Sequence, residues 1–443
     1  MKNFYILLLI ILFQKTYAQY TVITDVNFEQ ELINQGIDSN SIVDGQILTS
    51  SINTITSLNI NSQIAANIIN LNGLEDFTSL QELIFFSAGS LQLINISQNL
   101  YLKKIVLINP QISYLNTSSN LALETLYLYY ASQLSTIDLS NNTNLKDLEI
   151  GNFNIAQLNL INNIYLEKLR LNNTLISQLD LTNNTLLKYV YSLNNPIATI
   201  DLSYNLSLEY LYIASSFVSN IDLSQNLNLK YLSLYINPIQ NLDVGNNMLL
   251  EELGCSNNLL ISLNLNNNPF LNKVLCKNYI SSFQNNFSSL NLQNDANNLL
   301  NGVYDIGSGS IPPTYSNRFD STNNPNLNCI FVDDVANCNI NWLGKDPTSN
   351  YVSSQQECNQ LDNYEFVVES ETIVYPNPVK EILYVESNSE IQETIVYDLF
   401  GKVILEQNEK NTTKINFSNI SNGLYFVKIV SKNGTVVKKI IKK

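Results

Sequence analysis

The sequence predicts a mainly β protein, in which a solenoid of stacked turns carries a cap at each end and is followed by a small β-sandwich. Two observations carry this prediction. A Leu-rich phrase returns in turns that begin at residues 100, 121, 143, 164, 185, 206, 227 and 248, and all but one of the intervals are 21 residues long. Residues 373–443 instead alternate apolar and polar residues in short runs, with Asn-Gly pairs that are typical of hairpin turns.

Each turn fits one pattern, L-x-x-L-x-L-x-x-x-x-I-x-x-L-x-L-x-x-N. One turn fills its slots with Leu166, Leu169, Leu171, Ile176, Leu179, Leu181 and Asn184. A single turn cannot bury its own Leu side chains, so neighbouring turns have to stack and share one core. The pattern is typical of a leucine-rich repeat solenoid. Over residues 52–295 it resembles the nested 21-residue class of bacterial leucine-rich repeats, which implies a surface that binds a protein or a glycan.

Two residue types within the repeat are predicted to be structural. The Asn that closes each phrase should satisfy backbone groups of its own turn and of the next one, as stacked Asn side chains do. Equivalent positions hold Asn163, Asn184, Asn205, Asn226 and Asn268. Cys255 and Cys276 occupy Leu slots and are predicted to be small core residues.

The chain divides into six predicted segments. They are a secretory signal (1–18), an N-terminal cap (19–51), the solenoid (52–295), a C-terminal cap (296–358), a linker (359–372) and a β-sandwich (373–443). The signal has Lys2, a short apolar run, and Ala18 before the expected cleavage at Gln19. Within the N-terminal cap, Asp25 is predicted to begin a helix that ends near Gln35. No other apolar run is long enough to span a bilayer, so we do not expect an integral helical membrane protein.

Composition excludes several classes of function. The chain has no His, which removes His-based acid/base catalysis and His-ligated metal sites. Residues 19–372 hold 11 Lys and Arg against 31 Asp and Glu, a net charge of −20. Such an acidic surface repels phosphate backbones, so we expect no nucleic-acid partner.

A column of alternating charge runs along the repeat. Its members, one per turn, are Lys103, Glu124, Lys146, Glu167, Lys188, Glu209, Lys230 and Glu251. Stacking places each charge between opposite charges, and opposite-charge pairs on neighbouring strands are worth about 0.2–1 kcal/mol each. We interpret the column as structural, because a slip by one turn would bring like charges together.

A second column is acidic, and two explanations fit it. Its members are Asp138, Asn159, Asp180, Asp201, Asp222, Asp243 and Asn264. Each carboxylate can accept hydrogen bonds from nearby backbone N–H or hydroxyl groups and so shape the turn. The alternative is a row of calcium sites at Asp180, Asp201, Asp222 and Asp243, since Ca²⁺ prefers oxygen ligands. We favour the first explanation, and predict no cofactor, because Asn159 and Asn264 interrupt the charge and Ca²⁺ needs six or more oxygens.

Tyrosines follow the first strand of several turns, where the sequence predicts the concave face. The predicted binding residues are Tyr189, Tyr191, Tyr210, Tyr212, Tyr231 and Tyr235. Tyr offers a large, fairly rigid contact area with a hydroxyl and is enriched at recognition surfaces. The alternative is that stacked Tyr side chains only stabilise the sheet.

Residues 324–358 resemble the C-terminal cap that accompanies such repeats in secreted bacterial proteins. Cys329 and Cys358 bracket this segment, and a disulfide between them suits an exported protein. Cys338 is left over.

The last segment resembles the type A C-terminal sorting domain of the type IX secretion system. The matching motifs are YPNP (Tyr375, Pro376, Asn377, Pro378), YDLFGK, which contains Gly401, and SNGLYFVKI, which contains Gly423, followed by a basic tail. The resemblance implies that the type IX machinery of a Gram-negative bacterium exports the chain. It also implies that this domain is then removed, with the rest released or attached to the cell surface.

Two functions from different classes remain. The first is an exported, non-catalytic binding or adhesion protein that recognises a protein or a glycan through the solenoid. The second is a secreted polysaccharide hydrolase that works with carboxylates. We favour the first and predict no enzyme, because the acidic residues belong to repeat columns or caps.

Overall fold

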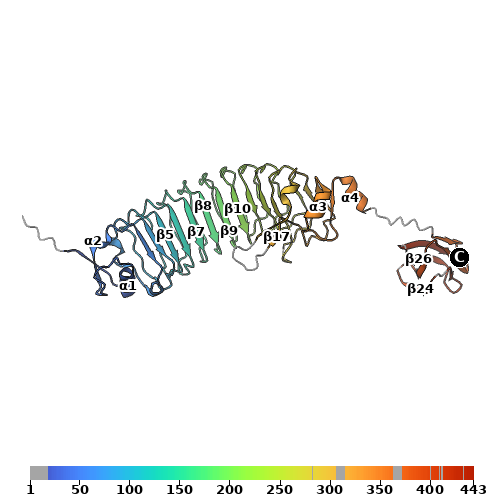
Figure 1. Cartoon of the computed structure of the whole chain (residues 1–443), viewed down its shortest axis with the longest axis horizontal. Helices are drawn as coiled ribbons and strands as arrows, with labels where there is room; N and C mark the ends of the chain where they lie inside the picture. The colour runs from blue at the N-terminus through green and yellow to red at the C-terminus, as the bar shows by residue number, and fades with distance from the viewer. Residues whose placement is uncertain are drawn as a thin grey trace, which may run out of the picture. The chain divides into compact units, whose positions relative to one another are not determined.

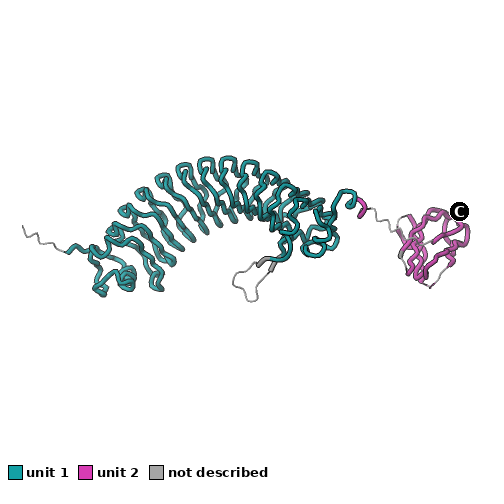
Figure 2. The backbone as a smooth tube through the Cα atoms, turned by 45° about the horizontal axis from the view of Figure 1, so that its top comes forward, with its two compact units in different colours: residues 1–358 teal, residues 359–443 magenta. Residues whose placement is uncertain are grey.

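The computed structural model describes residues 18–281, 283–305, 315–362, 372–399, 401–408, 410, 413–432 and 434–443. The predicted secretory signal lies outside these residues except for Ala18, and so does most of the predicted linker. The chain forms two compact units, residues 1–358 and residues 359–443, which Figure 2 shows in different colours.

Unit 1 is built on a twelve-stranded sheet in which the strands lie parallel and side by side (Figure 1). Each strand pairs with its equivalent in the next turn, so that Leu169 of one strand lies opposite Val190 of the next. Figure 2 shows the turns of unit 1 following an arc. In spatial order the strands are β3 (Ser57–Ile60), β4 (Glu82–Phe85), β5 (Lys104–Ile108), β6 (Thr125–Tyr129), β7 (Asp147–Gly151), β8 (Lys168–Asn172), β9 (Tyr189–Leu193), β10 (Tyr210–Ala214), β11 (Tyr231–Ser233), β12 (Glu252–Gly254), β14 (Lys273–Leu275) and β18 (Phe319–Asp320).

The Leu pattern explains both the strands and the core. In β8, Leu169 and Leu171 point inward and are almost fully buried, while Lys168 and Arg170 face outward. Successive side chains of a strand point to opposite faces, so the L-x-L phrase buries one face only. The buried side chains of all turns join one continuous cluster. The predicted mainly β solenoid is confirmed.

Buried Asn side chains link the turns, as predicted. The Nδ2 of Asn163 donates hydrogen bonds to the carbonyls of Leu139 (3.1 Å) and Asn142 (2.9 Å) in the preceding turn. The same two bonds recur at Asn120, Asn142, Asn184, Asn205, Asn226, Asn247 and Asn268. We call these residues, with Asn163, the buried Asn ladder. It supplies a second donor to carbonyls that also accept a backbone N–H within their own turn.

In the turns of β5 to β12, a residue shortly after the main strand has a left-handed backbone. The φ angle is positive at Asn109, Tyr130, Asn152, Asn173, Asn194, Ser215, Ile236 and Asn257. Asn tolerates this conformation because its short polar side chain can bond locally, whereas a β-branched residue is strained in it. Ile236, with φ of 54°, is therefore the strained member of the column.

Replacing Ile236 by Asn is expected to stabilise unit 1 by about 1 kcal/mol, because it relieves the left-handed strain at an incompletely buried side chain. Chemical denaturation of the full chain measures the effect. Ile161→Asn is the control, since it makes the same substitution at an exposed position that has no positive φ. Equal effects of the two substitutions would contradict the strain at Ile236.

The N-terminal part of unit 1 contains β1 (Tyr20–Val22), α1 (Val26–Asn34), β2 (Gln46–Leu48) and α2 (Thr49–Ile52), and the 3-10 helices η1 (Gln63–Asn67) and η2 (Leu74–Asp76) follow β3. Asp25 caps α1 through bonds from the N–H groups of Asn27 and Phe28, which confirms the predicted helix. Buried Glu29 accepts hydrogen bonds from the N–H groups of Asp44 and Gly45 and so holds the following loop.

The C-terminal part of unit 1 carries a second parallel sheet and two helices. Its elements are β13 (Ser262–Asn264), β15 (Ser289–Leu292), η3 (Asn297–Leu300), β16 (Val303–Asp305), β17 (Tyr315–Asn317), β19 (Cys329–Val332), α3 (Val335–Asn341), β20 (Asn350–Val352) and α4 (Gln355–Asp362). β13, β15, β19 and β20 form the sheet, and β16 pairs with β17.

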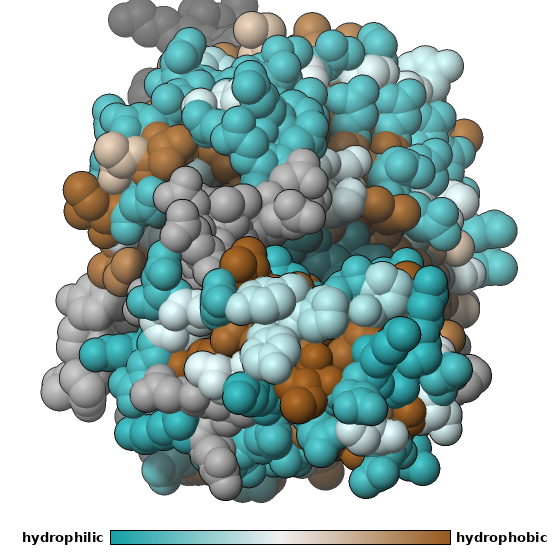
Figure 3. Space-filling model, turned by 90° about the vertical axis from the view of Figure 1, so that its right-hand side faces the viewer, coloured by the Kyte–Doolittle hydropathy of each residue, from teal (hydrophilic) through white to brown (hydrophobic). Residues whose placement is uncertain are grey.

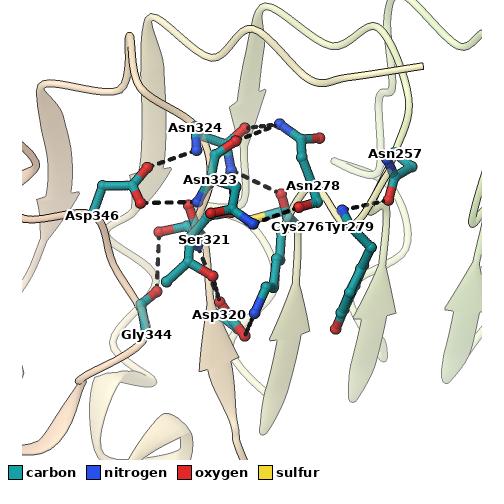
Figure 4. A network of polar contacts seen from close by, with 12 residues as sticks. Asn257, Cys276, Asn278, Tyr279, Asp320, Ser321, Asn323, Asn324, Gly344 and Asp346 are labelled. Carbon is teal, nitrogen blue, oxygen red and sulfur yellow. Dashed lines mark hydrogen bonds and ion pairs between the residues drawn. The ribbon is translucent and has the colours of Figure 1, made fainter. Parts of the chain in front are cut away.

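A polar network fastens this cap to the last turn, where the Nδ2 of Asn323 donates to the carbonyl of Asn278 (2.7 Å), and also joins segments of the cap to one another (Figure 4). Asp346 accepts hydrogen bonds from the N–H groups of Asn323 (2.9 Å) and Asn324 (2.6 Å). The N–H of Ser321 donates to the carbonyl of Gly344, and a Cβ at Gly344 would lie 2.2 Å from the carbonyl oxygen of Phe319. Only glycine allows this close approach of the two backbones.

Unit 2 packs two antiparallel sheets around its own core, as the predicted β-sandwich requires. One sheet contains β21 (Ile373–Tyr375), β22 (Ile382–Glu386) and β25 (Lys414–Asn416). The other contains β23 (Ile391–Tyr397), β24 (Val403–Gln407), β26 (Gly423–Ser431) and β27 (Gly434–Lys442). Figure 3, seen from the C-terminal side, shows hydrophobic residues at the surface between hydrophilic ones.

Candidate functional site

Two columns of stacked Tyr side chains stand on the outward face of the twelve-stranded sheet. Tyr210 lies between Tyr189 and Tyr231 in strand register, and its ring centroid is 4.2 Å from each of theirs. The rings are nearly parallel, with interplanar angles of 10° and 4°. The second column pairs Tyr191 with Tyr212 at 4.5 Å. We call these five residues the Tyr surface.

Four of the five hydroxyls of the Tyr surface have a raised pKa and stay neutral at physiological pH, those of Tyr191, Tyr210, Tyr212 and Tyr231. Burial, followed by the neighbouring tyrosines, raises the pKa of Tyr212 to about 12. The same two causes raise the pKa of Tyr210 and Tyr191. The columns therefore present uncharged hydroxyls that can both donate and accept hydrogen bonds.

An ion-pair cluster closes the N-terminal end of the Tyr surface. The guanidinium of Arg170 lies over the ring of Tyr189, 4.9 Å from its centroid. The same guanidinium bonds Asp147 at 2.9 Å and lies 3.5 Å from Glu149. Cation–π contact and two carboxylates together hold Arg170 in place.

Tyrosines beyond this cluster have another role. The hydroxyl of Tyr127 donates to Asp147 at 2.9 Å, and that of Tyr129 donates to Glu149. Both hydroxyls are thus bonded to carboxylates, whereas Tyr210 interacts with its neighbours Tyr189 and Tyr231. Tyr235, the sixth predicted residue, leaves the columns and meets Tyr279 edge to face at 5.8 Å.

Sequence reasoning missed Arg170 and Tyr279. A register signal was present for Arg170, because it stands 21 residues before Tyr191 in the column that also holds Glu149. No such signal existed for Tyr279, which follows the last regular turn. Its ring lies 5.2 Å from the Nζ of Lys277 and extends the aromatic surface toward the C-terminal cap.

The alternating charge column forms ion pairs in one direction only. Lys146 bonds Glu124, Lys188 bonds Glu167 and Lys230 bonds Glu209, at 2.8–2.9 Å. Each ammonium thus meets the carboxylate of the preceding turn. The hydrogen bond that Lys146 donates to Glu124 raises the pKa of Lys146, and the bond that Lys230 donates to Glu209 raises the pKa of Lys230.

Lys188→Glu is expected to lower the melting temperature of unit 1 at low salt, because the new carboxylate would face those of Glu167 and Glu209 in the neighbouring turns. Exposed pairs are worth roughly 0–1 kcal/mol, so the change is modest and shrinks at high salt. Lys188→Gln, which removes the charge without reversing it, should have a smaller effect. An unchanged melting temperature for Lys188→Glu at low salt would show that the column does not stabilise the solenoid.

The carboxylates of the acidic column accept hydrogen bonds from nearby backbone N–H groups, as the explanation that they shape the turn requires. The Oδ1 atoms of Asp180, Asp201, Asp222 and Asp243 each accept from the N–H two residues on, at 2.8–3.0 Å. Bonds from Thr182, Ser203 and Ser224 lower the pKa of Asp180, Asp201 and Asp222. Among the residues that the structure describes, no three His, Cys, Asp or Glu side chains cluster as metal ligands. The calcium alternative stays an untested prediction.

The cysteines that bracket the C-terminal cap lie together. Cys329 and Cys358 are joined in a disulfide with their Cα atoms 5.9 Å apart. Cys255, Cys276 and Cys338 are buried thiols.

The sorting motif holds the last strand of unit 2. The Nδ2 of Asn377 donates to the carbonyl of Lys439 (2.8 Å), and its Oδ1 accepts from the N–H of Ile441 (2.9 Å). Asn377 lies between Pro376 and Pro378, and the peptide bonds after Tyr375 and Asn377 are cis. Gly401 has φ of 78° in the turn between β23 and β24, where its N–H donates to Asp398. Gly423 begins β26.

Residues 373–443 match the family described as secretion system C-terminal sorting domain. Unit 2 is a sorting domain. This confirms the type IX resemblance drawn from the YPNP, YDLFGK and SNGLYFVKI motifs. Within the described part of the chain, no helix combines the length and apolar character needed to cross a membrane.

Solved structures similar to the chain include leucine-rich repeat proteins of two bacteria. The functional domain of InlJ from Listeria monocytogenes is 19% identical over 96% of this chain and 99% of that one, with a TM-score of 0.34. The internalin InlF of the same species is 18% identical over 74% and 95%, with a TM-score of 0.45. A Leptospira interrogans leucine-rich repeat protein is 20% identical over 53% and 66%, with a TM-score of 0.44. No curated protein matches the chain.

The assignment of unit 1 rests on its own strands and repeat pattern. Strands recur at intervals of 21 or 22 residues from β5 to β14 with Leu side chains in the core. Unit 1 is a leucine-rich repeat solenoid, as the sequence predicted.

Proposed function

We propose that this chain is an exported, non-catalytic protein that binds or adheres to a protein partner through the Tyr surface. The type IX machinery delivers it to the cell surface or the medium through the sorting domain. The observation that carries the proposal is the pair of stacked, half-buried Tyr columns on the outward face of the main sheet. Aromatic residues and Arg are enriched at protein interfaces and provide most of their hot spots.

The stacking geometry favours a protein over a glycan. A sugar ring packs flat against an exposed aromatic face. Here the rings of Tyr189, Tyr210 and Tyr231 cover one another's faces, and Arg170 covers the outer face of Tyr189. A ligand therefore meets ring edges and hydroxyls, which suit carbonyl groups and the faces of other aromatic side chains.

The carboxylates beside the Tyr surface support binding rather than hydrolysis. Glycoside hydrolysis needs a pair of carboxyl groups that flank the substrate, one of them protonated. Asp147 and Glu149 both lie against Arg170, and Glu252 bonds Lys273 at 3.0 Å. These carboxylates are thus engaged in ion pairs within the chain and are not arranged as a pair that flanks a substrate.

The test is a capture experiment with the full chain on a support. Surface proteins from candidate host or neighbouring cells, a glycan array and a polysaccharide panel are offered in parallel. The proposal expects specific capture of a protein and no change in the polysaccharides. Specific capture of a glycan without a protein partner would show that the chain binds glycans instead. Release of reducing sugars would show that it is a polysaccharide hydrolase.

Export is expected to remove unit 2. The protein recovered from the surface or medium should start near Gln19 and should lack peptides from residues 380–443 in mass spectrometry. Abundant peptides from this region in extracellular protein would show that the sorting domain is retained.

A further inference from the structure

Six of the eight turns that begin at residues 100 to 248 expose a large apolar side chain immediately after a buried Asn. The column contains Leu100, Leu121, Ile164, Leu206, Leu227 and Met248, each 47–58% exposed. Thr143 and Thr185 fill its two remaining positions. We call this column the apolar ridge. It lies in the turns that precede the main strands and contains none of the residues of the Tyr surface.

The ridge is preformed and large enough to form an interface. The buried Asn ladder fixes the residue before each ridge position. Further bonds join ridge turns directly, from Asn144 Nδ2 to the carbonyl of Leu121 (2.9 Å) and from Asn228 Nδ2 to that of Leu206 (3.0 Å). Such rigidity reduces the entropy lost on association.

Neighbouring side chains widen the ridge. The position after it adds Tyr101, Tyr165 and Phe270, which are 48–64% exposed. A standard interface buries about 800 Å² per partner, and nine large apolar side chains that are half exposed approach that area. Exposed apolar patches of this size are typical of interaction sites.

The charge column next to the ridge identifies the partner. It lies three residues further along each turn, and its sign alternates through eight turns. A two-fold axis between the turns that begin at 164 and 185 would reverse the order of the turns in a second copy. The facing pairs would then be Lys103 with Glu251, Glu124 with Lys230, Lys146 with Glu209, and Glu167 with Lys188.

Every one of these pairs joins opposite charges. A shift of the partner by one turn would set every Lys against a Lys and every Glu against a Glu. The charged side chains are accessible for such contacts, since those of Lys188 and Glu167 are 52% and 38% exposed. A surface that is complementary to itself under one two-fold axis suits an isologous dimer.

We propose that the apolar ridge and the charge column form an antiparallel dimer interface with a second copy of this chain. A membrane surface is the less favoured occupant. The ridge carries no net charge beside it, and residues 19–372 have a net charge of −20, which anionic lipids repel. The proposal goes beyond the binding function and does not depend on it.

Sedimentation velocity of the full chain over a range of concentrations tests the dimer. The double variant Leu206→Ser/Leu227→Ser should weaken self-association at least tenfold. Leu175→Ser/Phe217→Ser is the matched control, because both residues are equally exposed apolar side chains off the ridge, and it should associate as the unsubstituted protein does. A chain that stays monomeric at every concentration overturns the proposal, as does equal weakening by both double variants.

Cysteine cross-linking tests the register. Leu121 and Leu227 should face each other across the two-fold axis, so an oxidised mixture of Leu121→Cys and Leu227→Cys chains should give a disulfide-linked dimer. Each variant alone should give none, because identical positions lie several turns apart. Equal cross-linking in the single-variant samples overturns the register. A contrary outcome is that the full chain binds anionic phospholipid vesicles and does not associate with itself. If Leu206→Ser/Leu227→Ser then abolishes vesicle binding, the ridge is a membrane-binding surface and the dimer is overturned.

Discussion

Replacing Asn163 by Asp is expected to lower the free energy of unfolding of unit 1 by about 3 kcal/mol or more. The Nδ2 of Asn163 donates to the carbonyls of Leu139 and Asn142, and the side chain is fully buried. A carboxylate of the same shape has no donor and would set an oxygen against both carbonyls. Both carbonyls keep a backbone donor, since Leu139 accepts from the N–H of Asn142 and Asn142 accepts from that of Leu145. The loss therefore comes from oxygen–oxygen repulsion and from the buried charge.

The neighbouring residue provides a matched control. Asn162 is exposed and donates one bond to the carbonyl of Ser140 at 2.9 Å. Asn162→Asp adds the same charge one residue away but should cost about 1 kcal/mol or less, since water can replace the lost donor. Urea unfolding of the full chain, followed for unit 1, measures both variants. Similar losses at the two positions would contradict the ladder as the main link between turns.

The pH dependence of the Asn163→Asp loss has a definite sign. Burial favours the neutral carboxyl in the folded chain, whereas the unfolded chain ionises it readily. The unfolded state therefore gives up its proton at lower pH, and the loss grows as pH rises. Toward acidic pH the protonated carboxyl recovers one donor, so the deficit relative to the unsubstituted protein should shrink.

The repeat made most of the fold predictable. Residues at equivalent positions of successive turns fall into register, so a column in the sequence becomes a column in space. The stacking of Tyr189, Tyr210 and Tyr231 and the depth of the Asn ladder follow from that one rule. The motifs of the sorting domain likewise located unit 2, because YPNP and the two Gly-containing motifs occur in order.

Side-chain detail could not be predicted from columns. Register places Lys146 between Glu124 and Glu167, but the direction of its bond depends on a rotamer that spacing does not determine. Arg170 reaches across strands to Asp147, a contact between different columns. The hydrogen bonds between the Asn377 side chain and β27 join residues more than 60 positions apart, and no repeat in the sequence predicts them.

The triple change of Tyr189, Tyr210 and Tyr231 to Ser is expected to abolish most partner binding while unit 1 stays folded. The three side chains form the centre of the Tyr surface, and the Leu residues beneath them remain. Aromatic anchors at the centre of an interface commonly cost about 2 kcal/mol or more when truncated. If only one of the three substitutions costs this much binding free energy, the dissociation constant increases about 30-fold.

Two exposed tyrosines off the sheet provide the control. Tyr114 and Tyr204 are 65% and 57% exposed and lie in turns outside the main strands. Tyr114→Ser/Tyr204→Ser should leave binding unchanged. Circular dichroism and urea unfolding of every variant show whether the solenoid persists. Unfolding of the triple variant would assign the Tyr columns to sheet stability, the alternative that the sequence left open.

The dissociation constant of the captured protein for the triple Tyr variant, measured beside the unsubstituted full chain, decides whether the Tyr surface binds the partner. We predict a folded triple variant that binds at least about 30-fold more weakly. A folded triple variant with an unchanged dissociation constant would contradict it and would place recognition on another surface of the solenoid.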